Sequence, residues 1–230
     1  MPKVVHHLFK SDEKHLEQIE ESLLLSASDL AKEGSIEHIE IEDILNKAQV
    51  SRSTFYKIFN SADGLFKALG QKLTNEMVAY ALSHSPEIPD PAIRVVIKTK
   101  QALLFAAKAP FLASLALKTE WPSSDPNHVM YKDIEKDFIE GKTQGYFSDM
   151  PPSIGTNMII GCLRGAVKDL LESKQSDDYA DKVVYQILIS LGVDSKTAAA
   201  LSKSSVSEFP VPPKGMASNI ASLQNHTKTD

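Results

Sequence analysis

Apolar residues recur along this chain at the three- and four-residue spacing of amphipathic helices, and alternating apolar and polar residues never persist long enough to indicate a strand. In the first such stretch, about residues 12–32, Leu16, Ile19 and Leu23 begin an apolar stripe, and Gly34 follows as a plausible stop. Further helices are expected over about 42–48, 52–59, 62–80, 91–108, 110–118, 127–142, 152–173 and 177–202, the last with a break near Gly192. The predicted fold class is all-α.

Composition adds a tail and excludes two classes of protein. From residue 204 onward Ser, Pro, Asn, Thr and Lys dominate, which predicts a disordered tail over 204–230. No stretch approaches the roughly 20 apolar residues of a membrane helix. Cys162 is the single cysteine, so a disulfide framework within the chain is excluded. We therefore expect a cytoplasmic protein without membrane contact.

The charge of the chain argues mildly against a nucleic-acid partner, because DNA-binding proteins usually carry a basic surface. The net charge is -5. Residues 1–72 hold nine Lys or Arg against twelve Asp or Glu, a local net charge of -3. Any contact with DNA must therefore depend on where the few basic side chains lie.

Two short predicted helices, 42–48 and 52–59, are joined only by Gln49, Val50 and Ser51. A connection this short makes the helices cross steeply, as in a helix-turn-helix. Ser51 suits the N-cap of the second helix. On that helix Phe55, Ile58 and Phe59 form the inward stripe, and the outward face carries Arg52, Ser53, Tyr56 and Lys57. On spacing alone, an ordinary helical hairpin with a solvated face remains an equal alternative.

The residues of this segment resemble the signature of the tetracycline-repressor (TetR) family over about residues 15–70. The likeness includes the apolar first helix ending at Gly34, the Asp43-Ile44 pair, the turn Ala48-Gln49-Val50-Ser51, the run Thr54-Phe55-Tyr56, and Phe59-Asn60-Ser61. The resemblance implies an all-helical homodimer with a DNA-binding domain at 1–62, a ligand-binding and dimerisation domain at 63–203, and the tail beyond.

The resemblance also implies which residues contact double-stranded DNA. They are Ser51, Arg52, Ser53, Thr54, Tyr56 and Lys57, with Arg52 and Ser53 facing the major groove. Arg52 is the only Arg among residues 1–72, and guanidinium is the group that binds guanine with two hydrogen bonds. The sequence departs from the family at Gln49, where Gly is usual, at Ile39-Glu40, where Thr or Ser is common, and at Ala62, where a phosphate-binding Lys is common.

For the larger domain the resemblance implies architecture rather than individual residues. Small residues one turn apart allow close helix contact, so we expect a dimer interface that includes Gly161, Gly165, Val184 and Leu188; the alternative is that these helices complete the core of a monomer. A ligand pocket between the fourth helix and the helices up to about residue 142 would use the large side chains Phe105, Phe111, Leu115, Trp121, Met130, Tyr131 and Phe138, each of which is individually more typical of core. Such a lining favours a small apolar or aromatic effector.

Motifs of enzymes are missing from the sequence. Gly141-Lys142-Thr143 resembles the end of a phosphate-binding loop, but Lys136 stands where its first glycine belongs. No metal-ligand spacing and no catalytic motif occurs, so we predict a non-enzyme without cofactor or metal. The expected function is a transcriptional regulator, a repressor that binds a pseudo-palindromic operator as a dimer and is released by a small effector. The alternative is a dimeric helical sensor or adaptor with little DNA affinity; an enzyme with a site in the C-terminal helices is a remoter one.

Overall fold

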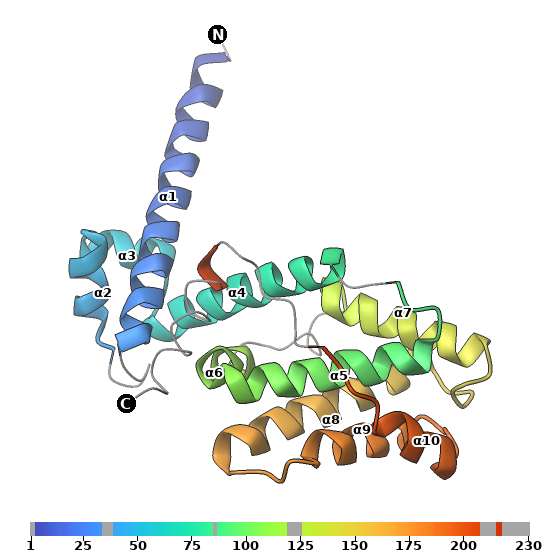
Figure 1. The fold of residues 1–230 in the computed structure, drawn as a ribbon. Helices are drawn as coiled ribbons and strands as arrows, with labels where there is room; N and C mark the ends of the chain where they lie inside the picture. The colour runs from blue at the N-terminus through green and yellow to red at the C-terminus, as the bar shows by residue number, and fades with distance from the viewer. Residues whose placement is uncertain (1–2, 34–38, 85–86, 119–125, 208–214, 218–230) are drawn as a thin grey trace. The chain divides into compact units, whose positions relative to one another are not determined.

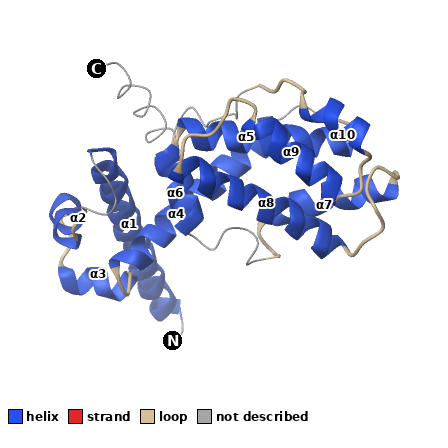
Figure 2. Ribbon diagram, turned by 90° about the horizontal axis from the view of Figure 1, so that it is seen from below, coloured by secondary structure: helices blue, strands red, loops and turns tan. Residues whose placement is uncertain are grey.

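A computed structural model describes residues 3–33, 39–84, 87–118, 126–207 and 215–217, and this described part contains ten α-helices and no strand (Figures 1 and 2). The all-α prediction is confirmed. The helices are α1 Lys3–Glu33, α2 Ile41–Ala48, α3 Arg52–Ile58, α4 Ala62–His84, α5 Pro91–Lys108, α6 Pro110–Lys118, α7 Val129–Thr143, α8 Pro152–Glu172, α9 Tyr179–Ser190 and α10 Ser195–Ser202.

Most helix ends lie within two residues of the sequence prediction, and the differences have local causes. α1 begins at Lys3, nine residues before its apolar stripe would suggest. The long C-terminal stretch is divided into α9 and α10, as predicted, because Gly192 takes a positive φ of 90° between them. Asp194 then caps α10 by accepting from the N–H groups of Lys196 and Thr197.

The chain separates into two compact units, Met1–Leu73 with Lys214–Asp230, and Thr74–Pro213. The division falls inside α4, eleven residues beyond the boundary expected at residue 62. Its physical reason is that the first turns of α4 bury their apolar side chains within the first unit. Among its described residues, the buried apolar side chains of that unit are Leu23, Leu24, Ala27, Ile44, Leu45, Phe55, Phe59, Leu65, Phe66, Leu69, Leu73, Met216 and Ala217.

The second unit is built around α5, which packs against α6, α7, α8, α9 and α10. Asp90 caps α5 with hydrogen bonds to the N–H groups of Ala92 and Ile93, and Pro91 occupies the first turn, where no N–H is needed. Large side chains of the core include Leu103, Phe138, Ile160, Ile187, Leu188 and Leu191, all nearly or fully buried. The unit thus provides a packed frame with α5 at its centre.

Part of the predicted tail is held against this frame. The carbonyl of Ser204 accepts a 2.7 Å hydrogen bond from Lys100 Nζ, and the carbonyl of Ser207 accepts one of 3.2 Å from Gln101 Nε2. Further along the tail, Met216 and Ala217 belong to the first unit and are buried. The expected disorder over 204–230 therefore does not extend to these described residues.

Across the described helices, none is on its own long and apolar enough to cross a membrane. α5 and α6 meet the requirements of length and apolar composition only when they are taken together, and the chain bends by 114° between them.

Candidate nucleic-acid interface and effector cavity

The helix-turn-helix expected from the sequence is present as α2, a three-residue turn and α3. Gln49 adopts the left-handed conformation, with φ 54° and ψ 39°, and ends α2. The Gln49 N–H donates to the carbonyl of Asn46, and the Val50 N–H donates to that of Leu45 at 3.0 Å. The sequence departure at Gln49 thus places a side chain where the backbone favours glycine.

The first turn of α3 is organised by Ser51, as predicted. Its Oγ accepts from the N–H of Thr54 at 3.1 Å, and it also lies within hydrogen-bond distance of the hydroxyls of Ser53, at 3.0 Å, and Thr54, at 2.8 Å. Capping satisfies one of the N–H groups that a helix start leaves unpaired. Ser51 therefore has a structural role whatever it contacts in a complex.

α3 separates an apolar face from a polar face. Phe55 is fully buried, and the centroid of its ring lies 5.8 Å from the ring centroid of Phe59. On the other face Arg52, Ser53, Tyr56 and Lys57 are exposed, and Thr54 is half-buried. The predicted contact residues thus form one continuous polar surface along α3.

Two cations on this face differ in their surroundings. Arg52 forms an ion pair through Nη2 with Oε1 of Glu42 in the first turn of α2. Lys57 has no ion pair among the described residues. Elsewhere in the first unit, Lys72 Nζ lies 3.1 Å from Oε1 of Glu21, and Lys47 Nζ lies 4.0 Å from Oδ2 of Asp29. Lys57 is the cation of α3 that is available to a phosphate without first losing a partner.

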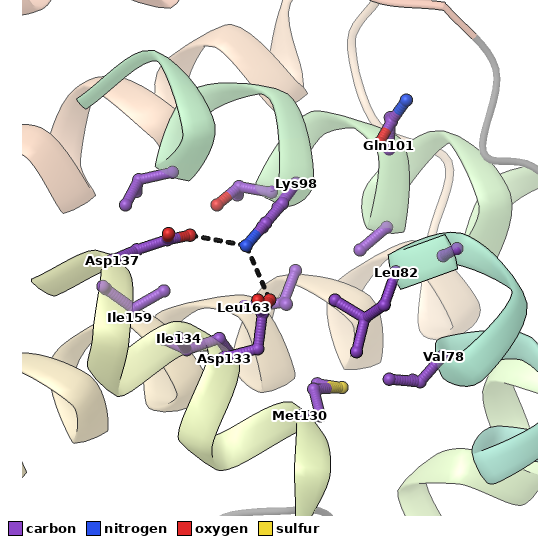
Figure 3. Close-up of a pocket in the computed structure, with 14 residues that line it drawn as sticks. Val78, Leu82, Lys98, Gln101, Met130, Asp133, Ile134, Asp137, Ile159 and Leu163 are labelled. Atoms are coloured by element: carbon purple, nitrogen blue, oxygen red, sulfur yellow. Dashed lines mark hydrogen bonds and ion pairs between the residues drawn. The ribbon is translucent and has the colours of Figure 1, made fainter. Parts of the chain in front are cut away.

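A cavity of about 100 Å³ lies in the second unit among α4, α5, α7 and α8 (Figure 3). Apolar side chains form most of its wall: Val78, Ala81, Leu82, Val95, Ala102, Met130, Ile134, Ile159 and Leu163. The polar lining residues are Lys98, Thr99, Gln101, Asp133 and Asp137. The cavity thus combines an apolar body with a strongly polar end.

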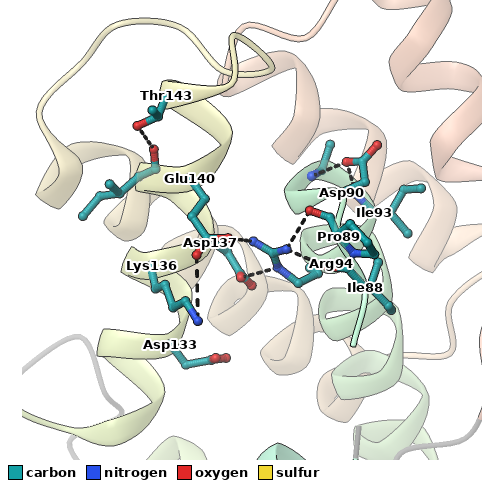
Figure 4. A network of polar contacts seen from close by, with 12 residues as sticks. Ile88, Pro89, Asp90, Ile93, Arg94, Asp133, Lys136, Asp137, Glu140 and Thr143 are labelled. Atoms are coloured by element: carbon teal, nitrogen blue, oxygen red, sulfur yellow. Dashed lines mark hydrogen bonds and ion pairs between the residues drawn. The ribbon is translucent and has the colours of Figure 1, made fainter. Parts of the chain in front are cut away.

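The polar end is an ion network between α5 and α7. Lys98 Nζ lies 2.6 Å from Oδ2 of both Asp133 and Asp137. Arg94 donates through Nε to Oδ1 of Asp137 at 2.6 Å, pairs with Glu140, and donates to the carbonyls of Ile88 and Pro89 (Figure 4). Asp137 is only 3% exposed, and its negative charge is balanced by the two cations Arg94 and Lys98.

The protonation of Arg94 follows from the same contacts. Burial alone would lower its pKa, but the hydrogen bonds and charges of Asp137 and Glu140 outweigh burial and raise the pKa above its ordinary value. The guanidinium therefore stays charged and holds α5 to α7.

The cavity uses a different set of side chains from the one expected. Of the predicted lining residues, Met130 is the one that faces this cavity. Leu115, Tyr131 and Phe138 are buried in packed surroundings, where burial also raises the pKa of Tyr131; Phe105 and Phe111 are half-buried elsewhere, and Trp121 lies outside the described residues. The buried aromatic side chains belong to the packed core, and the open space lies among aliphatic side chains of α4, α5, α7 and α8.

The residues predicted for a dimer interface divide into two groups. Gly161 and Gly165 are exposed on α8, and a Cβ built on either would meet nothing within 4 Å. The same surface of α8 exposes Ile154, at 47%, and Met158, at 37%. Val184 and Leu188 instead face the core of their own unit, at 1% and 0% exposure, so their placement at an interface is corrected.

Comparison with known proteins identifies the fold. No family model and no curated protein matches the sequence. The crystal structure of RolR in complex with resorcinol matches with a TM-score of 0.69 at 19% identity, covering 86% of this chain and all of that one. Ligand-free RolR matches at 0.70 and 16% identity, covering 82% of this chain and 99% of its own. A protein from Shewanella sp. PV-4 described as a TetR family transcription regulator matches at 0.58 and 16%, covering 76% and 99%. The chain has the all-helical fold of TetR-type regulators.

Proposed function

We propose that this protein is a transcriptional regulator of the TetR type that binds double-stranded DNA through α3 as a homodimer. The observation that carries the proposal is the α2–turn–α3 geometry, in which α3 buries Phe55 and presents Arg52, Ser53, Tyr56 and Lys57 on its exposed face. A helix of this kind fits the major groove, and its side chains reach base edges and phosphates. The fold shared with TetR-type regulators supports the same function.

Each residue on this face has a chemical role in the proposal. The Arg52 guanidinium donates two parallel hydrogen bonds to a guanine, and Ser53 lies beside it at the start of α3. Thr54, Tyr56 and Lys57 contact the DNA backbone, with Lys57 neutralising a phosphate. Ser51 keeps the first turn of α3 closed while these contacts form.

A two-fold dimer supplies the second reading helix that a pseudo-palindromic operator requires. We place the interface on the exposed surface of α8, where Gly161 and Gly165 leave room for a close approach and Ile154 and Met158 offer apolar area. Covering these side chains removes exposed apolar surface from water, which favours association.

We further propose that the protein represses transcription while it is bound to its operator, and that a small effector releases it from the DNA. α4 lines the cavity through Val78, Ala81 and Leu82, and the same helix buries Leu65 and Leu69 in the first unit. An effector that displaces α4 would therefore favour a conformation that no longer fits the operator. The structure of RolR with resorcinol supports a small aromatic ligand for a cavity in this fold.

A sensor or adaptor with little DNA affinity is the second candidate. It is favoured by the net charge of -3 over residues 1–72 and by the engagement of Arg52 with Glu42.

The two functions are distinguished by selecting bound sequences from a random DNA duplex pool with the effector-free protein. A regulator enriches two inverted half-sites whose centres lie about 34 Å apart. Recovery of a pool without any shared sequence, from a folded dimer, would favour the sensor or adaptor.

A further inference from the structure

We propose that the cavity selects an uncharged single-ring compound that carries a hydroxyl group, bound between Lys98 and Asp133. This inference rests on the effector part of the proposed function and adds the chemical class of the ligand. It follows from the hydrogen-bonding groups that the polar end of the cavity leaves open.

The ion network at this end leaves one donor and one acceptor side by side. A lysine ammonium has three N–H groups, and Lys98 uses two of them on Oδ2 of Asp133 and Oδ2 of Asp137. Both oxygens of Asp137 are engaged, because Arg94 donates to the other one, and Asp137 is only 3% exposed. Oδ1 of Asp133 has no partner among the described residues, and Asp133 and Lys98 remain 23% and 33% exposed. Both groups belong to the cavity wall (Figure 3).

A hydroxyl group is complementary to this pair because it donates one hydrogen bond and accepts another. It can donate to Oδ1 of Asp133 and accept from the third N–H of Lys98. A carboxylate would only accept, and it would face the charge of Asp133. An ammonium group would only donate, and it would face the charge of Lys98.

The charge of the network points in the same direction. Among the residues that line the cavity, Lys98 is the one cation and faces two carboxylates, Asp133 and Asp137. Arg94 and Lys136 balance the rest of the network outside this lining, through Asp137 and Glu140. An anionic ligand would therefore meet two carboxylates and one ammonium group at the cavity wall, an arrangement that disfavours a further negative charge.

The remaining wall limits the body of the ligand. Val78, Leu82, Ile134 and Leu163 offer no hydrogen bonds, so a sugar would leave most of its hydroxyls unpaired. A dry apolar cavity of roughly 150 Å³ accepts benzene in another protein, and the space of about 100 Å³ here suits one ring better than two.

Four ring compounds of similar size test the proposal by calorimetry on the full-length protein without DNA: phenol, toluene, benzoate and benzylamine. Phenol should bind about tenfold more tightly than toluene, since one well-made hydrogen bond contributes about 1 kcal/mol or somewhat more. Benzoate should bind more weakly than both. Tighter binding of benzoate or benzylamine than of phenol, or no binding of any of the four, overturns the proposal.

Two variants locate the effect. Asp133→Leu should reduce the ratio of phenol to toluene affinity to about one, because it removes the acceptor and leaves Lys98 paired with Asp137. Glu135→Leu, on the same helix but outside the cavity lining, changes the net charge equally and should keep the ratio. Asp133→Asn retains an acceptor oxygen and should keep part of the preference. An unchanged ratio in a folded Asp133→Leu protein contradicts the proposal.

The outcome is separable from that of the proposed function, since these measurements contain no DNA. A protein that prefers phenol but binds no duplex keeps this inference and loses the regulator assignment. A protein that binds an operator but prefers benzoate loses this inference alone.

Discussion

Arg52 and Glu42 form an ion pair that joins the first turn of α3 to the first turn of α2. Both side chains are more than half exposed, so the pair is accessible to solvent. Arg52 is also the residue that we propose to bind a guanine. In the proposed complex, Glu42 would compete with DNA for Arg52, and separating the pair would cost part of the binding free energy.

Removal of this competitor should strengthen DNA binding. Exposed ion pairs contribute about 0.2–1 kcal/mol, so Glu42→Gln should raise operator affinity by up to about fivefold. Fluorescence anisotropy with a labelled duplex measures the change. Glu17→Gln, an exposed carboxylate of α1 for which the described residues show no ion pair, is the matched control for charge. Equal gains in both variants would show that Glu42 acts only through net charge.

Substitutions on α3 should separate base reading from backbone binding. Arg52→Ala should cost about 1–3 kcal/mol on the preferred operator and much less on duplexes changed at the guanine, so base preference is relaxed. Lys57→Ala and Tyr56→Phe should weaken all duplexes alike. A competition assay with operator variants makes the comparison, and Lys132→Ala, on α7, serves as an exposed control. Identical preference profiles for wild type and Arg52→Ala would remove Arg52 from the reading face.

The turn before α3 stores strain that a substitution can relieve. Gln49 has φ 54°, a conformation that disfavours a Cβ by roughly 1 kcal/mol. Gln49→Gly should raise the free energy of unfolding by about 0.5–1 kcal/mol in urea denaturation, because the relief exceeds the added entropy of the unfolded chain. Gln49→Ala keeps the Cβ and should gain little; a larger gain for Ala than for Gly would refute the strain.

The surface of α8 allows a test of the dimer that leaves the protomer folded. Gly161 faces open space, so Gly161→Leu should keep the helical circular dichroism but shift the protein toward monomer in analytical ultracentrifugation. Operator affinity should fall with it. Gly155→Ala is the contrasting variant, since its Cβ would lie 2.2 Å from the Phe138 ring and should destabilise the fold instead. A Gly161→Leu protein that stays fully dimeric would place the interface elsewhere.

Sequence reasoning was most accurate where structure depends on local interactions. The apolar period sets the helices, the Ser51 hydroxyl caps α3, and Gly192 separates α9 from α10 because each effect involves neighbours along the chain. The polar face of α3 follows from the same local pattern, with Phe55 directed inward.

The residues that line the cavity and the interface could not be predicted from local sequence pattern, because they depend on which helices pack together. Periodicity shows that Val184 and Leu188 share an apolar face but not which neighbour covers it, and here that neighbour is their own core. Phe138 and Tyr131 were expected to line a pocket, yet both are buried in the core. A usable signal was present in Asp133 and Asp137, two carboxylates one turn apart on the same helix as the apolar residues Ile134 and Phe138, because a carboxylate that is buried beside such residues requires a partner such as Lys98.

If α3 binds DNA through charged contacts, as proposed, the affinity of the protein for DNA depends steeply on salt. We would measure the affinity of the effector-free dimer for its selected duplex over a range of salt concentrations. We expect the logarithm of the binding constant to fall linearly with the logarithm of the salt concentration, with a slope of about -0.9 for each phosphate contacted, and Lys57→Ala to make this slope shallower. Binding that is absent, or that does not change with salt, would contradict a DNA-reading function.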